Sequence, residues 1–177
     1  MAGRTREAAI TLGSAAVIIA ADQLTKALVV ANLAIGDSIH VVGDVVQIWH
    51  QENRGASFSL FQGGQLLFLA ATILALGLLA YFFRSMAGRS GWFFLLLGLT
   101  LGGALGNFVD RLFRGGAVVD FVSVGFGDTR FPTFNVADSA LNVGIIGFIV
   151  LLFFADRSKR PARPGERAPD APHDPPG

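Results

Sequence analysis

The chain has 177 residues, of which 52% are hydrophobic and 15% are charged, and its net charge is +1. A soluble domain carries about 25% charged residues, so the deficit indicates that lipid is part of the solvent around this protein. The small net charge and the lack of a basic stripe argue against nucleic-acid binding. Cysteine is absent, which excludes disulfides and thiolate chemistry, and the three histidines are not spaced as zinc ligands.

Four apolar stretches are long enough to cross a bilayer as helices, which takes about 20 residues. They run from about residue 8 to 33, 66 to 83, 91 to 109 and 139 to 155. The first contains Asp22 and Lys26, and its length and these charges distinguish it from a cleaved signal peptide. We therefore predict one membrane domain with four transmembrane helices over residues 1–155.

The positions of Lys and Arg outside the predicted helices indicate the orientation. Two arginines precede the first helix, two flank the turn between the second and third, and five basic residues follow the fourth. The positive-inside rule places these regions, and both termini, in the cytoplasm. Residues 34–65 and 110–138 then lie on the outer face. The tail over residues 156–177 holds six of the seven prolines and is predicted to be a disordered cytoplasmic segment.

The first outer segment, residues 34–65, has the composition of a small β-sheet. Ile39–Val42 and Val45–Trp49 are rich in β-branched residues, and Gly43-Asp44 between them fits a two-residue hairpin turn. Asn53-Arg54-Gly55 predicts another turn. The predicted fold class is therefore a membrane all-α protein with a small β element, a short sheet on the outer membrane surface.

Two aspartates lie where the second outer segment meets the membrane. Asp120 and Asp138 are both flanked by apolar residues, and a carboxylate at the edge of hydrocarbon is costly enough to suggest a function. Two such groups close together share a proton, which provides the acid and the base that aspartic proteolysis requires. For Asp138 a structural role is an equal alternative, because Asn135 as N-cap and Asp138 three residues later form a variant of the capping box.

Asp22 and Lys26 are four residues apart and share a helix face. Inside a bilayer they neutralise each other, so a structural ion pair is a better interpretation than direct catalysis. In the third predicted helix, glycines recur at every fourth position, which lets another helix approach closely; they are Gly98, Gly102 and Gly106.

The third predicted helix ends with the charged pair Asp110 and Arg111. Either Arg111 positions a carbonyl or carboxylate of a substrate, or it only pairs with Asp110. Two further patterns are interpreted as accidental. Gly125–Asp128 spells the GxGD of presenilin-type proteases but lies in a polar, glycine-rich loop, and Ser57 lacks the surroundings of a nucleophile elbow.

Five fragments in order resemble the motifs of the bacterial lipoprotein signal peptidase family, also called signal peptidase II. They are DQLTK (22–26), NRGASFS (53–59), GGALGNFVDR (102–111), VVDF (118–121) and FNVAD (134–138). Each alone is modest, but five in this order on four helices are specific. The resemblance covers about residues 8–155. The chain departs from it over Val122–Thr133, where family members often have aromatic residues and a His-Trp pair.

The resemblance implies an aspartic endopeptidase of the bacterial cytoplasmic (inner) membrane, with its active site at the outer face. Such enzymes remove signal peptides from prolipoproteins by cleaving before a cysteine that carries a diacylglyceryl group, and they need no metal or organic cofactor. The expected partners are these substrates and membrane lipid, and no nucleic acid. By resemblance, Asp120 and Asp138 are the catalytic dyad, and the residues lining the site are Asn53, Asn107, Arg111 and Asn135. Asp22, Lys26 and Asp110 are expected to support it.

One alternative is a small proton-coupled transporter or binder in which Asp22, Asp120 and Asp138 relay protons. Four helices and the lack of paired broken helices in matching halves argue against it.

Overall fold

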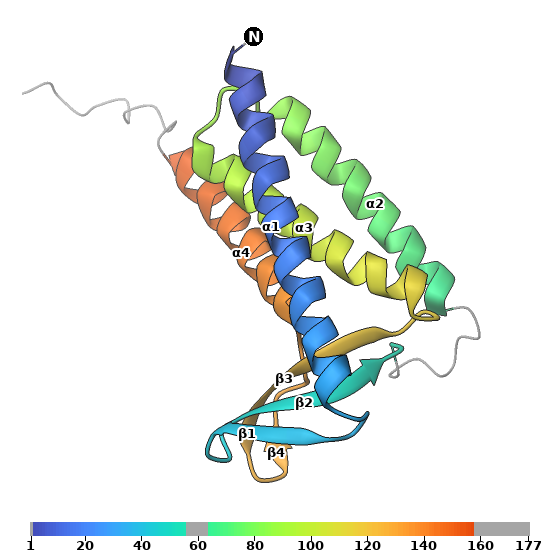
Figure 1. Ribbon diagram of the computed structural model, residues 1–177. Coiled ribbons are helices and arrows are strands. Elements are labelled where there is room, and N and C mark those ends of the chain that lie inside the picture. The colour runs from blue at the N-terminus through green and yellow to red at the C-terminus, as the bar shows by residue number, and fades with distance from the viewer. Residues whose placement is uncertain (1, 56–63, 158–177) are drawn as a thin grey trace, which may run out of the picture.

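Residues 2–55 and 64–157 are described by the computed structural model of the chain (Figure 1). Within these ranges four helices form a bundle, with bounds close to the predicted ones: α1 Ala2–Asn32, α2 Gly64–Ser85, α3 Gly91–Phe113 and α4 Val136–Arg157. Helix α4 begins three residues earlier than expected, so Asp138 lies in its first turn. It also continues past residue 155, into the region that was predicted as a disordered tail.

Helix α3 is the centre of the bundle and contacts the other three helices. Among the described residues, α1, α3 and residues Val136–Phe154 of α4 are long and apolar enough to cross a membrane, and α2 contributes a shorter apolar helix, Ala70–Ser85. Large apolar side chains of all four helices face outward, for example Leu12, Ile73 and Ile149, each at least 60% exposed. Buried carboxylates and exposed aliphatic side chains together indicate a membrane-integral bundle.

Glycines bring α3 against its neighbours. An added Cβ at Gly102 would lie 2.9 Å from the Ala15 carbonyl oxygen and 2.8 Å from Cβ of Ile18, both on α1. At Gly106 it would lie 2.9 Å from Oδ2 of Asp22. The predicted close helix approach is therefore present, and it joins α1 to α3.

A four-stranded antiparallel sheet lies at one end of the bundle, beyond the C-terminus of α1 (Figure 1). Its strands, in spatial order, are β1 Ser38–Val42, β2 Val46–Asn53, β3 Val118–Phe126 and β4 Thr129–Arg130. The sheet is larger than predicted, because residues 110–138 were expected to be a loop and instead supply two of its strands. A core of Val29, Val119 and Phe121 joins the sheet to α1.

The structure contains turns at the three places where the sequence predicts them. The β1–β2 turn has three residues rather than two, since Val42 pairs with Val46 and the Val45 N–H donates to the Val42 carbonyl at 3.0 Å. Asn53 is the last residue of β2, and its Oδ1 accepts a hydrogen bond of 2.8 Å from the Gly55 N–H, so the predicted turn begins on the strand. Gly127 and Asp128 form the exposed β3–β4 turn, as expected for a glycine-rich loop.

Candidate active site

Asp120 lies on β3, opposite Gln51 of β2, and is only 2% exposed. Its Oδ2 accepts a hydrogen bond of 2.9 Å from Asn53 Nδ2, and its Oδ1 accepts one of 2.7 Å from Asn135 Nδ2. Burial raises the pKa of Asp120 to about 6, and the charge of Asp138 adds to this, while the bonds from Asn53 and Asn135 oppose it. A carboxyl group with such a pKa exchanges its proton near neutral pH.

Asp138 lies in the first turn of α4 and is held from two directions. The backbone N–H of Asn135 donates to its Oδ2 at 3.2 Å, and its own N–H donates to Asn135 Oδ1 at 2.9 Å. This is the predicted capping box. Asn107 Nδ2 also donates to Asp138 Oδ1 at 2.7 Å. The structural and the functional interpretations of Asp138 are therefore compatible, since one carboxylate caps the helix and faces the polar cluster.

Two asparagines connect the carboxyl groups of Asp120 and Asp138. Asn135 Nδ2 lies 2.7 Å from Asp120 Oδ1 and 3.1 Å from Asn107 Oδ1. Asn107 Nδ2 in turn donates to Asp138 at 2.7 Å. Both asparagines are buried, with 0% exposure for Asn135 and 7% for Asn107. Segments far apart in the sequence thus bring both aspartates to one polar cluster at the junction of the sheet and the helices.

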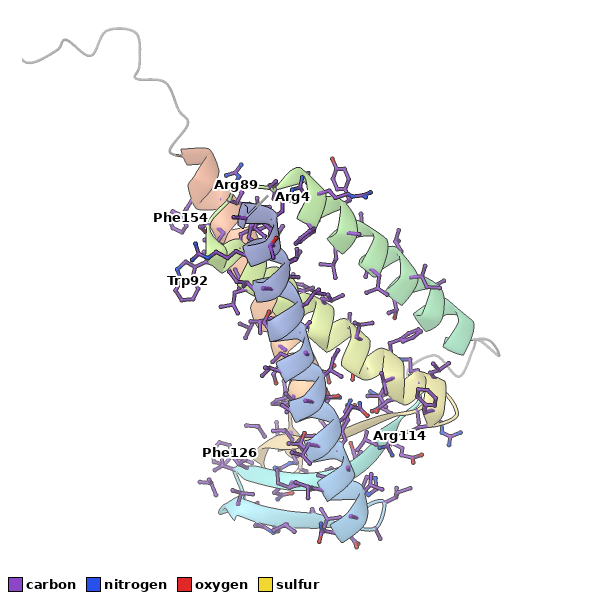
Figure 2. All side chains as sticks on the ribbon, turned by 45° about the horizontal axis from the view of Figure 1, so that its top comes forward. Arg4, Arg89, Trp92, Arg114, Phe126 and Phe154 are labelled. Carbon is purple, nitrogen blue, oxygen red and sulfur yellow. The ribbon has the colours of Figure 1, made fainter. Side chains whose placement is uncertain are left out.

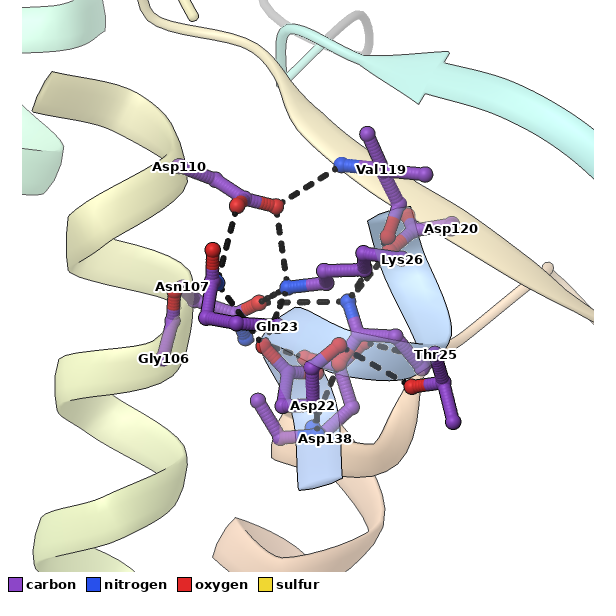
Figure 3. A network of polar contacts seen from close by, with 12 residues as sticks. Asp22, Gln23, Thr25, Lys26, Gly106, Asn107, Asp110, Val119, Asp120 and Asp138 are labelled. Carbon is purple, nitrogen blue, oxygen red and sulfur yellow. Dashed lines mark hydrogen bonds and ion pairs between the residues drawn. The ribbon is translucent and has the colours of Figure 1, made fainter. Parts of the chain in front are cut away.

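Lys26 lies at the centre of the buried charges beneath this cluster (Figure 3). Its Nζ is 2.8 Å from Asp22 Oδ2, 2.9 Å from Asp110 Oδ2 and 3.0 Å from Asn107 Oδ1. The predicted pair of Asp22 and Lys26 is therefore present, but Asp110 is a third member. Asp110 was expected among the supporting residues, but its contact with Lys26 was not predicted because Asp110 comes from another helix. Gln23 was also missed, and its Nε2 donates to Asp110 Oδ1 at 3.0 Å.

The carboxylates of Asp110 and Asp22 each accept a hydrogen bond from a backbone N–H next to a candidate catalytic residue. Asp110 Oδ2 accepts from the Val119 N–H at 3.1 Å, immediately before Asp120. Asp22 Oδ1 accepts from the Ala137 N–H at 2.9 Å, immediately before Asp138. Lys26 holds these two carboxylates, and through them it fixes the backbone next to Asp120 and Asp138.

Arg111 lies within electrostatic range of Asp138, Asp120 and Asp110. Its guanidinium donates to the Asn107 carbonyl at 3.4 Å. The ion pairs of Asp110 are formed with Lys26 and, at 3.4 Å, with Arg114. Asp128 is exposed in the β3–β4 turn, away from the cluster. Ser57 lies outside the described residues.

The family described as Signal peptidase (SPase) II matches residues 14–154 of the chain. A lipoprotein signal peptidase of Shouchella clausii is 40% identical over 146 residues, which are 82% of this chain and 94% of that protein. One of Geobacillus thermodenitrificans is 43% identical over 146 residues, covering 82% of this chain and 91% of that protein.

Two solved structures, both described as bacterial membrane enzymes determined by the in meso method, have similar folds. One, at 1.9 Å resolution, is 35% identical with a TM-score of 0.74, covering 80% of this chain and 91% of that chain. The other, at 2.3 Å, is 33% identical with a TM-score of 0.75, covering 90% and 94%. The matched region contains every residue of the cluster around Asp120 and Asp138, and on these grounds the chain belongs to the signal peptidase II family of membrane peptidases.

Proposed function

We propose that the chain removes signal peptides from prolipoproteins by cleaving before a diacylglyceryl-modified cysteine, with Asp120 and Asp138 as its catalytic dyad. The observation that carries the proposal is the connection of the two carboxyl groups through Asn107 and Asn135. Asparagine amides supply fixed donors and acceptors, so the two carboxyl groups keep their relative position without the cost of a further buried charge.

The environments of the two aspartates support different roles. Asp138 accepts two hydrogen bonds and lies at the N-terminus of α4, where the helix dipole favours a negative charge. Asp120 is buried, and burial raises its pKa to about 6. We therefore assign Asp138 as the ionised base and Asp120 as the protonated acid.

In the proposed reaction, Asp138 takes a proton from a water molecule that attacks the carbonyl carbon of the scissile peptide bond. Asp120 donates a hydrogen bond to the developing oxyanion and then supplies its proton toward the leaving amine. The Arg111 guanidinium, within electrostatic range of both carboxylates, is assigned to orient a substrate carbonyl. Each cycle ends with one proton on the pair, as it began.

We infer that the protein lies in the bacterial inner membrane with the sheet and the dyad at the outer face and both termini in the cytoplasm. The distribution of side chains supports this orientation. Arg4 and Arg89 lie at the end of the bundle opposite the sheet, where Trp92 and Phe154 have the positions of interfacial aromatic anchors (Figure 2). A substrate with its acyl chains in the bilayer would then present its peptide bond at the level of the dyad.

The proposal is tested by cleavage of a lipidated precursor by purified variants. Asp120→Asn and Asp138→Asn are each expected to lower turnover by at least a thousandfold while the protein stays folded, because asparagine keeps the shape but transfers no proton. Asp128→Asn is the matched control and is expected to retain full activity, since Asp128 lies in an exposed turn. The same precursor without its diacylglyceryl group is expected to be cleaved hardly at all. Robust turnover by either dyad variant would refute the assignment.

A further inference from the structure

Among the described residues, the edge of β2 next to the dyad is open. Strand β1 pairs with β2 only over Val46–Trp49, whereas β3 pairs with it as far as Asn53. The chain preceding β1 makes its last backbone contacts at His50, whose N–H donates to the Asp37 carbonyl at 3.0 Å and whose carbonyl accepts from the Gly36 N–H at 2.9 Å. Within residues 2–55 and 64–157, no strand therefore covers this edge beyond His50.

The backbone of Glu52 points to this open edge. Glu52 pairs with Val119 of β3. The Val119 N–H donates to Asp110 Oδ2 at 3.1 Å, and its carbonyl accepts from Asn135 Nδ2 at 3.3 Å, so both groups of Val119 are directed away from β2. Val119 and Glu52 therefore form a non-hydrogen-bonded antiparallel pair, in which Glu52 also directs its N–H and C=O away from its partner strand β3. Glu52 thus offers one donor and one acceptor to an added strand.

A groove of about 450 Å³ includes this edge and ends beside a residue that contacts the dyad, Asn53. It is lined by β2 from Trp49 to Asn53, by Ile35 and Gly36 before β1, and by Pro132 and Thr133 before α4. Asn53 lies both in the groove and next to the dyad, because its Nδ2 also donates to Asp120 Oδ2 at 2.9 Å. Glu52 is the charged residue of the lining, and its carboxylate also pairs with Arg54 at 3.5 Å.

A histidine in the lining is anchored to the end of α1. The His50 Nδ1 bonds the Leu33 carbonyl at 2.8 Å, which requires a hydrogen on Nδ1. Its Nε2 is buried and has no partner among the described residues.

We propose that this groove binds the segment of the substrate that follows the scissile bond, as an extended strand added to the open edge of β2. The inference rests on the proposed function, since it takes the dyad as the point of cleavage. The signal peptide lies in the membrane with the helices, and the segment after the bond has to leave on the side of the sheet. The groove is lined by Asn53, whose side chain bonds Asp120, so it adjoins the dyad on that side.

The geometry also gives the register. An added strand lies two strand spacings from β3, or roughly 10 Å to the side of Asp120, and an extended chain advances about 3.3 Å per residue. Pairing with Glu52 therefore starts about three residues after the scissile bond. Since the bonds are made by backbone, binding is expected to depend on chain conformation and little on side-chain identity.

The first test uses synthetic lipidated substrates with single N-methyl groups at successive positions after the scissile bond. The one substrate residue that pairs with Glu52 donates its N–H to the Glu52 carbonyl, so kcat/KM is expected to fall about tenfold when that N–H is methylated and to stay unchanged at the neighbouring positions. A uniform loss at all positions, or no loss at any, would overturn the inference. Failure of the wild-type protein to cleave even the unmethylated substrate would instead overturn the proposed function.

The second test fills the groove. Ile35 is 64% exposed in the lining, and Ile35→Trp is expected to raise KM about tenfold for a substrate with eight residues after the bond. It should not change KM for a substrate that ends one residue after the lipidated cysteine. Ile39→Trp is the control, since Ile39 is 53% exposed on β1 outside the groove. Equal effects on the long and short substrates, or equal effects of the two variants, would contradict strand addition.

Discussion

Asp120 and Asp138 share two asparagines but differ in what surrounds their carboxyl groups. Asp138 is half-buried and accepts hydrogen bonds at a helix N-terminus, where a charge is favoured. Asp120 is buried on a strand, where a charge is costly. In the proposed mechanism these surroundings give the two side chains opposite roles, and this assignment predicts how activity depends on pH.

Activity is expected to fall as pH rises through about 6, because Asp120 is raised to a pKa of about 6 and loses its acidic proton above it. This alkaline limb of the pH profile reflects the titration of the two coupled carboxyl groups as a pair. The hydrogen bond from Asn53 stabilises the ionised form of Asp120, so Asn53→Ala should raise this pKa and move the alkaline limb to higher pH. The measurement is kcat/KM of a lipidated substrate against pH.

Asn32→Ala serves as the control for this shift, because the Asn32 side chain is exposed and, within the described part of the chain, bonds the Leu28 carbonyl in its own helix. Its profile should match that of the wild type. A limb that moves to lower pH in Asn53→Ala, or moves equally in both variants, would contradict the assignment of Asp120 as the acid.

Lys26 neutralises two buried carboxylates, so its loss is expected to be more damaging than the loss of either one. Lys26→Met leaves Asp22 and Asp110 uncompensated and should destabilise the fold by about 3–5 kcal/mol. Adding Asp22→Asn to Lys26→Met should recover part of this, because one of the two stranded charges is removed. The measurement is the midpoint of thermal unfolding in detergent.

Leu24→Met is the control for the Lys26 variants, since Leu24 lies in the same turn and is 62% exposed. Strictly additive effects of Lys26→Met and Asp22→Asn would mean that these side chains do not interact, contrary to their 2.8 Å contact.

At the scale of elements, the helices were predictable and half of the sheet was not. Long apolar runs define α1 to α4, and β-branched residues predict β1 and the start of β2. Strand β3 was missed because Val118–Phe121 is buried on both faces, which removes the alternation that identifies a strand. The hydrogen bond from the Asn53 side chain to Asp120 could not be predicted either, since it depends on the register of β2 and β3 and on an irregularity between Ile48 and Gln51.

The glycine contact between α1 and α3 supports a prediction of its own. An added methyl group at Gly102 would meet backbone and side-chain atoms of Ala15 and Ile18 at 3.0 Å or less, so Gly102→Ala should separate the two helices. We expect a loss of about 1–3 kcal/mol, as for overpacked cores, and lower activity because Lys26 and Asp110 move apart.

Gly13→Ala is the matched control, because nothing lies within 4 Å of the added atom and alanine favours a helix. It should leave the unfolding midpoint unchanged or raise it slightly. If Gly102→Ala unfolds at the same temperature as Gly13→Ala, the close approach of α1 and α3 does not contribute to stability.

At the scale of the whole molecule, the bundle acts as a support for chemistry at one of its ends. α1 and α3 carry the charged group of Lys26, Asp22 and Asp110, and this group holds the backbone of β3 and α4 beside the dyad (Figure 3). In the proposed function, the helices form the scaffold, while the sheet and the N-terminus of α4 present the reacting groups. This division requires the sheet end of the bundle to face the compartment that receives the lipoprotein.

The orientation is tested by cysteine labelling, for which the chain is suited because it contains no cysteine. Ser38 lies exposed on β1 at the sheet end, and Ser85 lies exposed at the end of α2 near the α2–α3 turn. In spheroplasts, whose inner membrane is intact, an impermeant maleimide is expected to label Ser38→Cys and to leave Ser85→Cys unlabelled. After permeabilisation both should react, which shows that Ser85→Cys is accessible. Labelling of Ser85→Cys alone in spheroplasts would mean that the dyad faces the cytoplasm, and a lipoprotein cleaved at the outer surface could then no longer be the substrate.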